Sequence, residues 1–252
     1  MKNVVQNIYR RFRDSMESIG KKAGEKKAAH VLDMTEGNLY SLMLRFTMPV
    51  LLSQVFQQLY NTADAFIVGR YLGTNALAAV TSSGNLIFLM VSFFMGLAMG
   101  GGVVISRYFG AKDEKEVSRS VHTMMAFGLV CGLLLTVVGV AFTPTFLVWM
   151  RTDPEVMPEA VSYFRYYFLG ALAVVMYNIC CSIMNAVGNS KRPLYYLIFS
   201  SLVNIALDLL FIGGFGWGVW AAAVATVISQ AVSVALCMAY LLRDGNIYTV
   251  EL

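Results

Sequence analysis

Long apolar runs separated by short polar stretches occupy most of this 252-residue chain. About 20 apolar residues in a helix are enough to cross the hydrocarbon core of a bilayer. Six segments meet that length, at residues 42–68, 77–106, 118–147, 158–186, 193–212 and 217–242. Hydrophobic residues make up 58% of the chain and charged residues 13%, a balance unlike that of soluble domains. We therefore predict an all-α integral membrane protein, a bundle of six transmembrane helices.

The distribution of Lys and Arg predicts the orientation of these spans. Bases gather before the first span, after the second and after the fourth, whereas the other connections hold few bases or offset them with acids. Because cytoplasmic loops are enriched in Lys and Arg, we expect both termini on the cytoplasmic side of the cell membrane. The chain then divides into a basic tail at 1–40, a transmembrane domain at 41–243 and a short tail or linker at 244–252. The basic tail fits either a helix lying on anionic headgroups or a disordered segment.

Several classes of function are disfavoured by what the sequence lacks. The four cysteines fall in apolar runs without CxxC spacing, and no Gly-Lys-Ser/Thr phosphate loop or metalloprotease motif occurs. The net charge of +4 arises from bases at helix ends and not from a basic surface suited to nucleic acid. We therefore expect no enzyme, no cofactor and no nucleic-acid partner, and we expect the lipid bilayer as the surrounding medium.

Two aspartates lie within the predicted spans, Asp64 late in the first and Asp208 late in the fifth. A carboxylate at mid-bilayer costs roughly 2.5–3.5 kcal/mol, so such residues are candidates for function. The two spans run in the same direction, which predicts that both acids lie at similar depth toward the external side. Two acids so placed can share one proton or cation.

Polar residues repeat at helical spacing around both aspartates. Hydrogen-bonded packing between helices is the alternative explanation for such seams, and it is the better one for a single Ser or Thr. Hard cations prefer oxygen ligands, which favours a cation or substrate cavity near the carboxylates. Pro49, in the first span, either bends that helix as a gate or merely sets its tilt. The candidate cavity residues are Gln54, Gln57, Asn61, Asp64, Asn178, Asn204, Asp208 and Thr226.

Four stretches of the chain resemble the multidrug and toxic compound extrusion (MATE) transporters, in particular the DinF-type and MepA-like branch. They are QVFQQLYNTADAFIVGRY at 54–71, SRYFGAK at 106–112, AVGNSKRP at 186–193 and NIALD at 204–208. The similarity covers roughly residues 35–242 and corresponds to the N-terminal lobe of a twelve-helix transporter with two lobes. The resemblance implies a missing second six-helix lobe, so that the chain is either a fragment or a natural half-transporter.

The resemblance also implies a mechanism. It suggests that H⁺ or Na⁺ is exchanged for cationic or amphiphilic organic compounds. It places a possible Na⁺ site at Asp64, Asn204, Asp208 and Thr226. It also implies that Asn178 lines the same cavity and that Pro49 is the hinge. Two alternatives stay open. A lipid-linked oligosaccharide flippase of the same superfamily should carry bases in its cavity, and bases are almost absent from these spans. An inactive half-lobe or scaffold is compatible with the short length.

Overall fold

The computed structural model describes residues 38–242 of the chain. The expected basic tail at 1–40 and the short tail at 244–252 therefore fall wholly or almost wholly outside the described residues. Over 38–242 the chain forms helices and no strand, which confirms the all-α prediction. The helices are α2 Leu39–Leu72, α3 Thr74–Gly110, α4 Glu114–Trp149, α5 Met157–Leu169, α6 Ala171–Ala186, α7 Lys191–Asp208, the π-helical turn η1 Leu209–Gly214, and α8 Trp220–Leu241.

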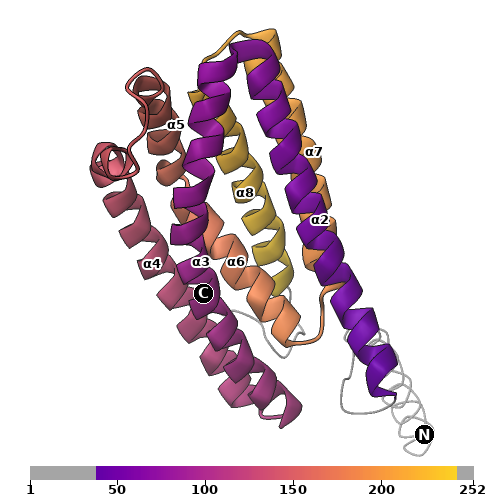
Figure 1. Cartoon of the computed structure of the whole chain (residues 1–252). Coiled ribbons are helices and arrows are strands. Elements are labelled where there is room, and N and C mark those ends of the chain that lie inside the picture. Colours follow the sequence, from indigo (N-terminus) through magenta and orange to yellow (C-terminus); the bar gives the residue numbers. More distant parts are fainter. Residues whose placement is uncertain (1–37, 243–252) are drawn as a thin grey trace, which may run out of the picture.

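These helices form six rods that run alternately up and down (Figure 1). The helix α7 continues into η1 as one rod, and α5 and α6 form another that is bent by 50°. In the described part of the chain, four rods are long and apolar enough to cross a membrane: α3 through Val91–Gly110, α4, α7 with η1, and α8. The bent pair of α5 and α6 makes a fifth candidate span.

The helix α2 differs from the other rods in composition. Its 34 residues exceed the length needed for a span, yet it is not among the helices that qualify by apolar character. The reason is its content of Gln, Asn, Thr and Asp over residues 54–64. It packs along α7 and also contacts α3, from which it diverges away from the turn that joins them (Figure 1). This is the rod on which polar groups are concentrated.

Local sequence explains where the helices begin and end. Asn38 and Asp113 cap α2 and α4, accepting hydrogen bonds from the backbone N–H groups of Tyr40 and Glu116. Gly73, with φ of 92°, makes the turn between α2 and α3 in a conformation that favours glycine. The break between α5 and α6 falls at Gly170, where an added Cβ would lie 2.1 Å from Cγ2 of Val227 on α8. The bend and the close contact with α8 therefore both depend on glycine.

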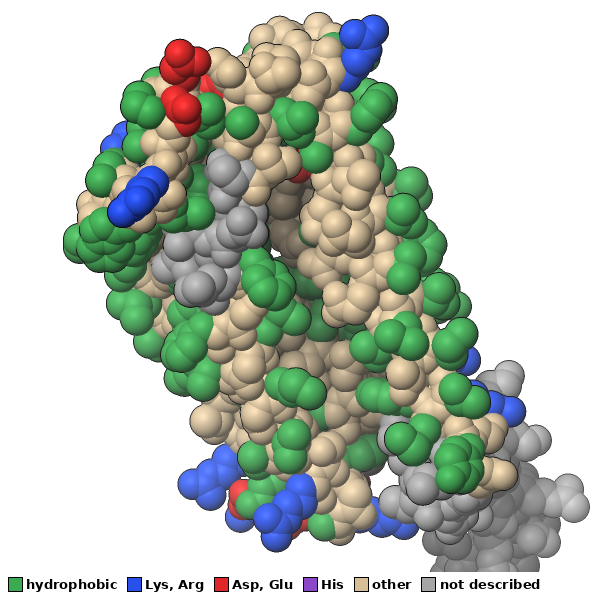
Figure 2. Space-filling view, in the orientation of Figure 1, with side chains coloured by type: hydrophobic (Ala, Val, Ile, Leu, Met, Phe, Trp, Pro, Cys, Tyr) green, Lys and Arg blue, Asp and Glu red, His purple; other side chains and the backbone are tan. Residues whose placement is uncertain are grey.

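Charged side chains of the described residues lie toward the two ends of the bundle, apart from Asp64, Asp208 and the exposed Arg165 of α5. One end carries most of the bases, on the α3–α4 turn and on the start of α7 (Figure 2). The other end carries the acids of the α4–α5 connection together with Arg70 and Arg151. Between these ends most of the described surface in Figure 2 is apolar or uncharged, as expected of a surface that faces lipid.

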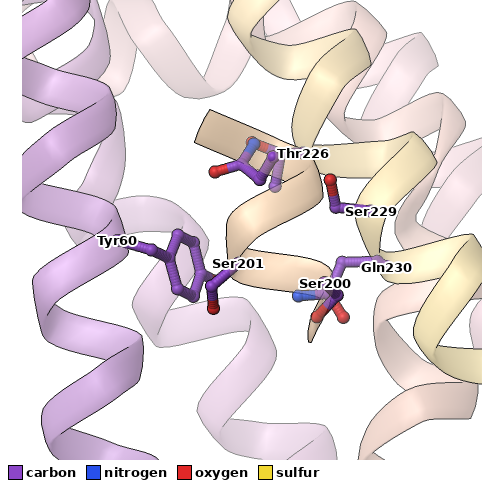
Figure 3. Close-up of a pocket in the computed structure, with 7 residues that line it drawn as sticks. Tyr60, Ser200, Ser201, Thr226, Ser229 and Gln230 are labelled. Carbon is purple, nitrogen blue, oxygen red and sulfur yellow. The ribbon is translucent and has the colours of Figure 1, made fainter. Parts of the chain in front are cut away.

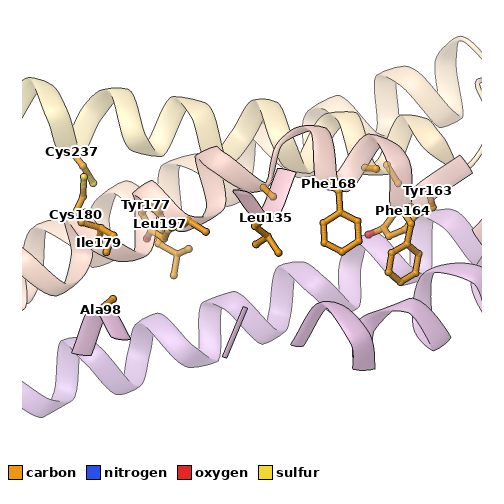
Figure 4. Packing of buried hydrophobic residues seen from close by; sticks show 14 of the residues in the cluster. Ala98, Leu135, Tyr163, Phe164, Phe168, Tyr177, Ile179, Cys180, Leu197 and Cys237 are labelled. Carbon is orange, nitrogen blue, oxygen red and sulfur yellow. The ribbon is translucent and has the colours of Figure 1, made fainter. Parts of the chain in front are cut away.

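The hydrophobic core lies where α4, α5 and α6 meet, and it extends to α8 (Figure 4). Phe164, Phe168 and Ile179 are among its largest side chains and are at most 2% exposed. Glycines of α4 allow α6 to approach closely, since an added Cβ at Gly132 would lie 2.6 Å from Cδ1 of Leu172. This apolar half supports the polar half formed by α2, α7 and α8.

Candidate functional site

The packing of α2 along α7 brings Asp64 and Asp208 together. Asp64 is 6% exposed and Asp208 is 0% exposed, and their carboxyl groups are close enough to interact electrostatically. Oδ1 of Asp64 and both carboxyl oxygens of Asp208 are buried without a hydrogen-bond partner. The ion pair found among the described residues joins Arg119 to Glu116, so no salt bridge to a Lys or Arg neutralises the aspartate pair.

Two of the predicted oxygen ligands flank this pair. Asn204 lies one turn before Asp208 on α7, and its Nδ2 donates a hydrogen bond of 3.5 Å to Oγ1 of Thr226 on α8. That bond orients the amide so that its Oδ1 remains an acceptor, and this oxygen is buried without a partner. Buried, unpaired carboxylate and amide oxygens are groups that a proton or a monovalent cation would bind.

Three tyrosines surround the carboxylates, and sequence reasoning missed them. Tyr60 lies beside Gln57, Asp64 and Gln230. Tyr163 of α5 is within electrostatic range of Asp64 and Asp208, and its ring stacks on Tyr167 at 6.2 Å. The signal was available, because Tyr60 precedes Asp64 by one turn of α2. Aromatic residues are so common along membrane helices that this spacing alone did not single them out.

A small pocket adjoins the site through Asn204 and Thr226, and Figure 3 shows the side chains around it. The space available to the centre of a water molecule is about 10 Å³, roughly enough for one water. Its walls come from α2, α7 and α8 and consist of Tyr60, Ser200, Ser201, Asn204, Thr226, Ser229 and Gln230. A pocket of this size holds water or a small ion and excludes an organic compound.

The remaining predicted residues are divided between the inside and the outside of the bundle. Gln57 is half-buried beside Tyr60. Gln54 and Asn61 belong to the same stripe of polar residues at helical spacing on α2, but they are exposed. Asn178 is half-buried on α6, where its Nδ2 donates to the carbonyl oxygen of Val174, and it does not line the pocket. Pro49 is buried inside α2 and not in its first turn.

Residues 49–210 match the family model described as MatE. The chain belongs to the MatE family. This MatE chain is 35% identical over 208 residues to the "Probable multidrug resistance protein YoeA" of Bacillus subtilis (strain 168), an alignment that covers 81% of the chain and 45% of the relative. It is 25% identical to a "Multidrug export protein MepA" of Staphylococcus saprophyticus, with 86% of the chain and 48% of the relative covered.

Solved structures extend the likeness of this MatE chain to its fold. One, described as a MATE in the bent conformation, is 26% identical with a TM-score of 0.80, covering 85% of this chain and 48% of the other. Another is described as the outward-facing conformation of a multidrug resistance MATE family transporter and has the same identity and TM-score, over 86% and 48% of the two chains. The MatE chain thus spans about half the length of the relatives and structures it matches.

Proposed function

We propose that this protein takes part in secondary active efflux, in which entry of H⁺ or Na⁺ drives the export of cationic or amphiphilic organic compounds. The observation that carries the proposal is the buried pair of Asp64 and Asp208, which has unpaired oxygens and no basic partner among the described residues. Two like charges in such a site favour binding of a cation or proton. The named multidrug relatives support the same direction.

The coupling cation would be held by four residues, namely Asp64, Asn204, Asp208 and Thr226. Asn204 Oδ1 and the carboxylate oxygens supply unpaired acceptors, and Thr226 Oγ1 can add a lone pair beside its bond from Asn204. A cation in this position replaces hydration with fixed oxygens at a site closed to lipid. Each charge that moves inward across the membrane gains about 2.3 kcal/mol per 100 mV, which supplies the driving force.

The exposed polar edge of α2 supports a second lobe as partner. Gln54, Gln58 and Asn61 are exposed at mid-membrane depth, where contact with acyl chains leaves their amides without hydrogen bonds. The surface is hollowed between α2 and α3 on the face seen in Figure 2. A second six-helix lobe facing this edge would enclose a watery cleft, which suits an organic substrate better than the small pocket does. The six spans at 41–243 would then form one lobe of the transporter.

Pro49 supplies a point at which α2 can bend. A proline inside a helix removes one backbone hydrogen bond, and here Oγ of Ser53 donates to the Pro49 carbonyl at 2.8 Å. Structures of relatives are described in bent and straight conformations. We infer that bending of α2 at Pro49 changes the access of Asp64 to the two sides. Cation binding shifts this equilibrium only if the two states bind the cation differently.

The membrane orientation remains part of the proposal. The basic end of the bundle would face the cytoplasm, with both termini there, and the acidic α4–α5 connection would face outward. Asp64 and Asp208 would then lie in the external half. A flippase of lipid-linked phosphates is disfavoured, because the described interior carries acids and no base.

Efflux of ethidium from cells expressing the chain tests the proposal. Asp64→Asn and Asp208→Asn should each reduce efflux to that of cells without the chain, because a neutral amide no longer exchanges the coupling cation. Asp113→Asn is the matched control, since this aspartate caps α4 at the bundle's end and Asn caps equally well. Unchanged efflux in both site variants would refute the coupling role. Absence of efflux from the unaltered chain would favour the half-lobe or scaffold alternative.

A further inference from the structure

Buried oxygens without partners form a series from the carboxylate pair toward the basic end of the bundle. Beyond the aspartates and Glu159, the described residues with such atoms are Asn204, Gln230, Ser233, Asn185 and Ser190. The residues Asn204, Gln230, Ser233 and Ser190 are at most 8% exposed. Buried polar atoms are nearly always satisfied by protein or by ordered water, so a row of unsatisfied ones indicates water or an ion.

The depth of these residues follows from helix direction. Along α7, Ser200, Ser201 and Asn204 come before Asp208 and so lie nearer the basic end where α7 begins. The helix α8 runs in the opposite direction, so Ser229, Gln230 and Ser233 lie progressively nearer that end than Thr226 does. Asn204, one turn before Asp208, is thus the lining residue of α7 nearest in depth to the carboxylates, and the other lining residues of α7 and α8 lie toward the basic end.

The chemistry of the pocket wall favours a cation. The hydroxyls of Ser200 and Ser201 both donate to the carbonyl oxygen of Leu197, and Ser229 donates to that of Ala225. Their hydrogens are committed to their own helices, which leaves oxygen lone pairs for the pocket. The amide oxygens of Asn204 and Gln230 add further free acceptors. A wall rich in acceptors suits a hydronium, a monovalent cation or a water that donates both hydrogens, and it disfavours an anion.

We propose that this pocket is the inward release station of the coupling cation, a hydrated site that receives H⁺ or Na⁺ from Asp64 and Asp208 and conducts it between α7 and α8 to the basic end. Gln230 and Ser233 are its transfer residues, and Asn185 and Ser190 continue the route. The ion thus leaves through the interior of the six-helix bundle, whereas the organic compound, too large for the pocket, uses the outer cleft. This inference rests on the proposed function, because it requires a cation at the aspartate pair.

Carbodiimide labelling of Asp64 and Asp208 from each side of the membrane tests this route. Carbodiimides modify protonated carboxyl groups, so labelling, followed by mass spectrometry, falls when the site loses its proton or binds Na⁺. Inverted vesicles and right-side-out vesicles containing the full chain allow pH or Na⁺ to be raised on one side at a time. In the unaltered chain, a sudden rise of pH or Na⁺ should suppress labelling whether it is made on the cytoplasmic side (a cytoplasmic jump) or on the external side (an external jump).

Two variants of the proposed route should separate the two sides: Gln230→Leu in the pocket wall and Ser233→Ala nearer the basic end of α8. After a cytoplasmic jump, suppression should be slower by about tenfold, because the acceptors that carry the cation are gone. After an external jump it should proceed as in the unaltered chain, which also shows that the variants are folded. Thr136→Val is the matched control, since Thr136 bonds only the carbonyl of Gly132 on its own helix and lies outside the pocket. It should leave both responses unchanged.

Three results would overturn the inference: a cytoplasmic response as fast in both variants as in the unaltered chain, equal slowing from both sides, or a response of the unaltered chain to the external side alone. If labelling of the unaltered chain did not change with pH or Na⁺ on either side, the cation site itself would be refuted. The failure of the release route is thus distinguishable from the failure of the proposed function.

Discussion

Two seams of the bundle are built in opposite ways. The apolar seam joins α4 to α5 and α6, where Gly128, Gly132 and Gly139 face Ile179, Leu172 and Phe168 with no room for an added carbon. The polar seam joins α2, α7 and α8, where buried oxygens lack partners and a pocket remains open. Tight packing fixes a single arrangement of the helices, whereas unsatisfied polar groups can still bind water, a proton or an ion. The apolar seam is therefore the scaffold, and the polar seam is where we propose that the cation binds.

The largest effect should come from filling the apolar seam at Gly139. An added Cβ would lie 2.2 Å from Cδ1 of Phe168, a side chain that is 1% exposed. Because the ring has no space into which to move, Gly139→Ala should lower the free energy of unfolding by about 3 kcal/mol. The thermal midpoint of the full chain in detergent measures this loss.

Gly100→Ala is the control for this substitution. No described atom lies within 4 Å of a Cβ built at Gly100, and alanine is the better helix former by about 1 kcal/mol. This variant should unfold at the same temperature as the unaltered chain or higher. Equal losses at Gly139 and Gly100 would show that the apolar seam is not the tighter part of the bundle.

A substitution in the polar seam should instead raise the stability of the chain. Asp208→Asn removes one of two buried like charges that no base neutralises and gives Asp64 an amide donor. At neutral pH it should raise the free energy of unfolding by about 2 kcal/mol, the scale of an uncompensated buried polar group. Asp113→Asn, which keeps its cap on α4, should leave the midpoint unchanged. A lower midpoint for Asp208→Asn would mean that the carboxylate has a stabilising partner, contrary to the comparison between the seams.

Sequence reasoning could single out residue types that are costly in lipid, although their role as a cation site stays a prediction. Asp64 and Asp208 were singled out because a carboxylate in a span demands an explanation, and the helix packing indeed brings them together. The stripe of α2 was recognised as well, but helical spacing does not say which edge of a stripe is buried. That division depends on how α2 packs against α7 and α3, and it buries Asp64 while it leaves Gln54 and Asn61 exposed.

Other features depend on partners that are remote in sequence. The Gly96 and Gly100 pair has the spacing of a helix-packing motif, yet no described atom approaches either position within 4 Å. The glycines that do meet another helix are spread along α4 and are recognised only once Leu172 and Phe168 are placed against them. The sequence predicted one continuous span at 158–186, whereas the structure breaks it at Gly170, and the π-helical turn after Asp208 was not predicted.

The smallest effect concerns the contact of α3 with α6, which combines properties of both seams. Oγ of Ser182 donates to the carbonyl of Ala98 at 2.8 Å, and a Cβ at Gly102 would lie 2.5 Å from that same oxygen. Gly102→Ala should therefore destabilise the chain, and Ser182→Ala should relieve most of the loss by removing the atom in the way. A double-mutant cycle of thermal midpoints should give a coupling energy of about 1 kcal/mol. If the losses of stability of the two single variants simply added in the double variant, the Ser182 hydroxyl would not be the atom that obstructs a side chain at position 102.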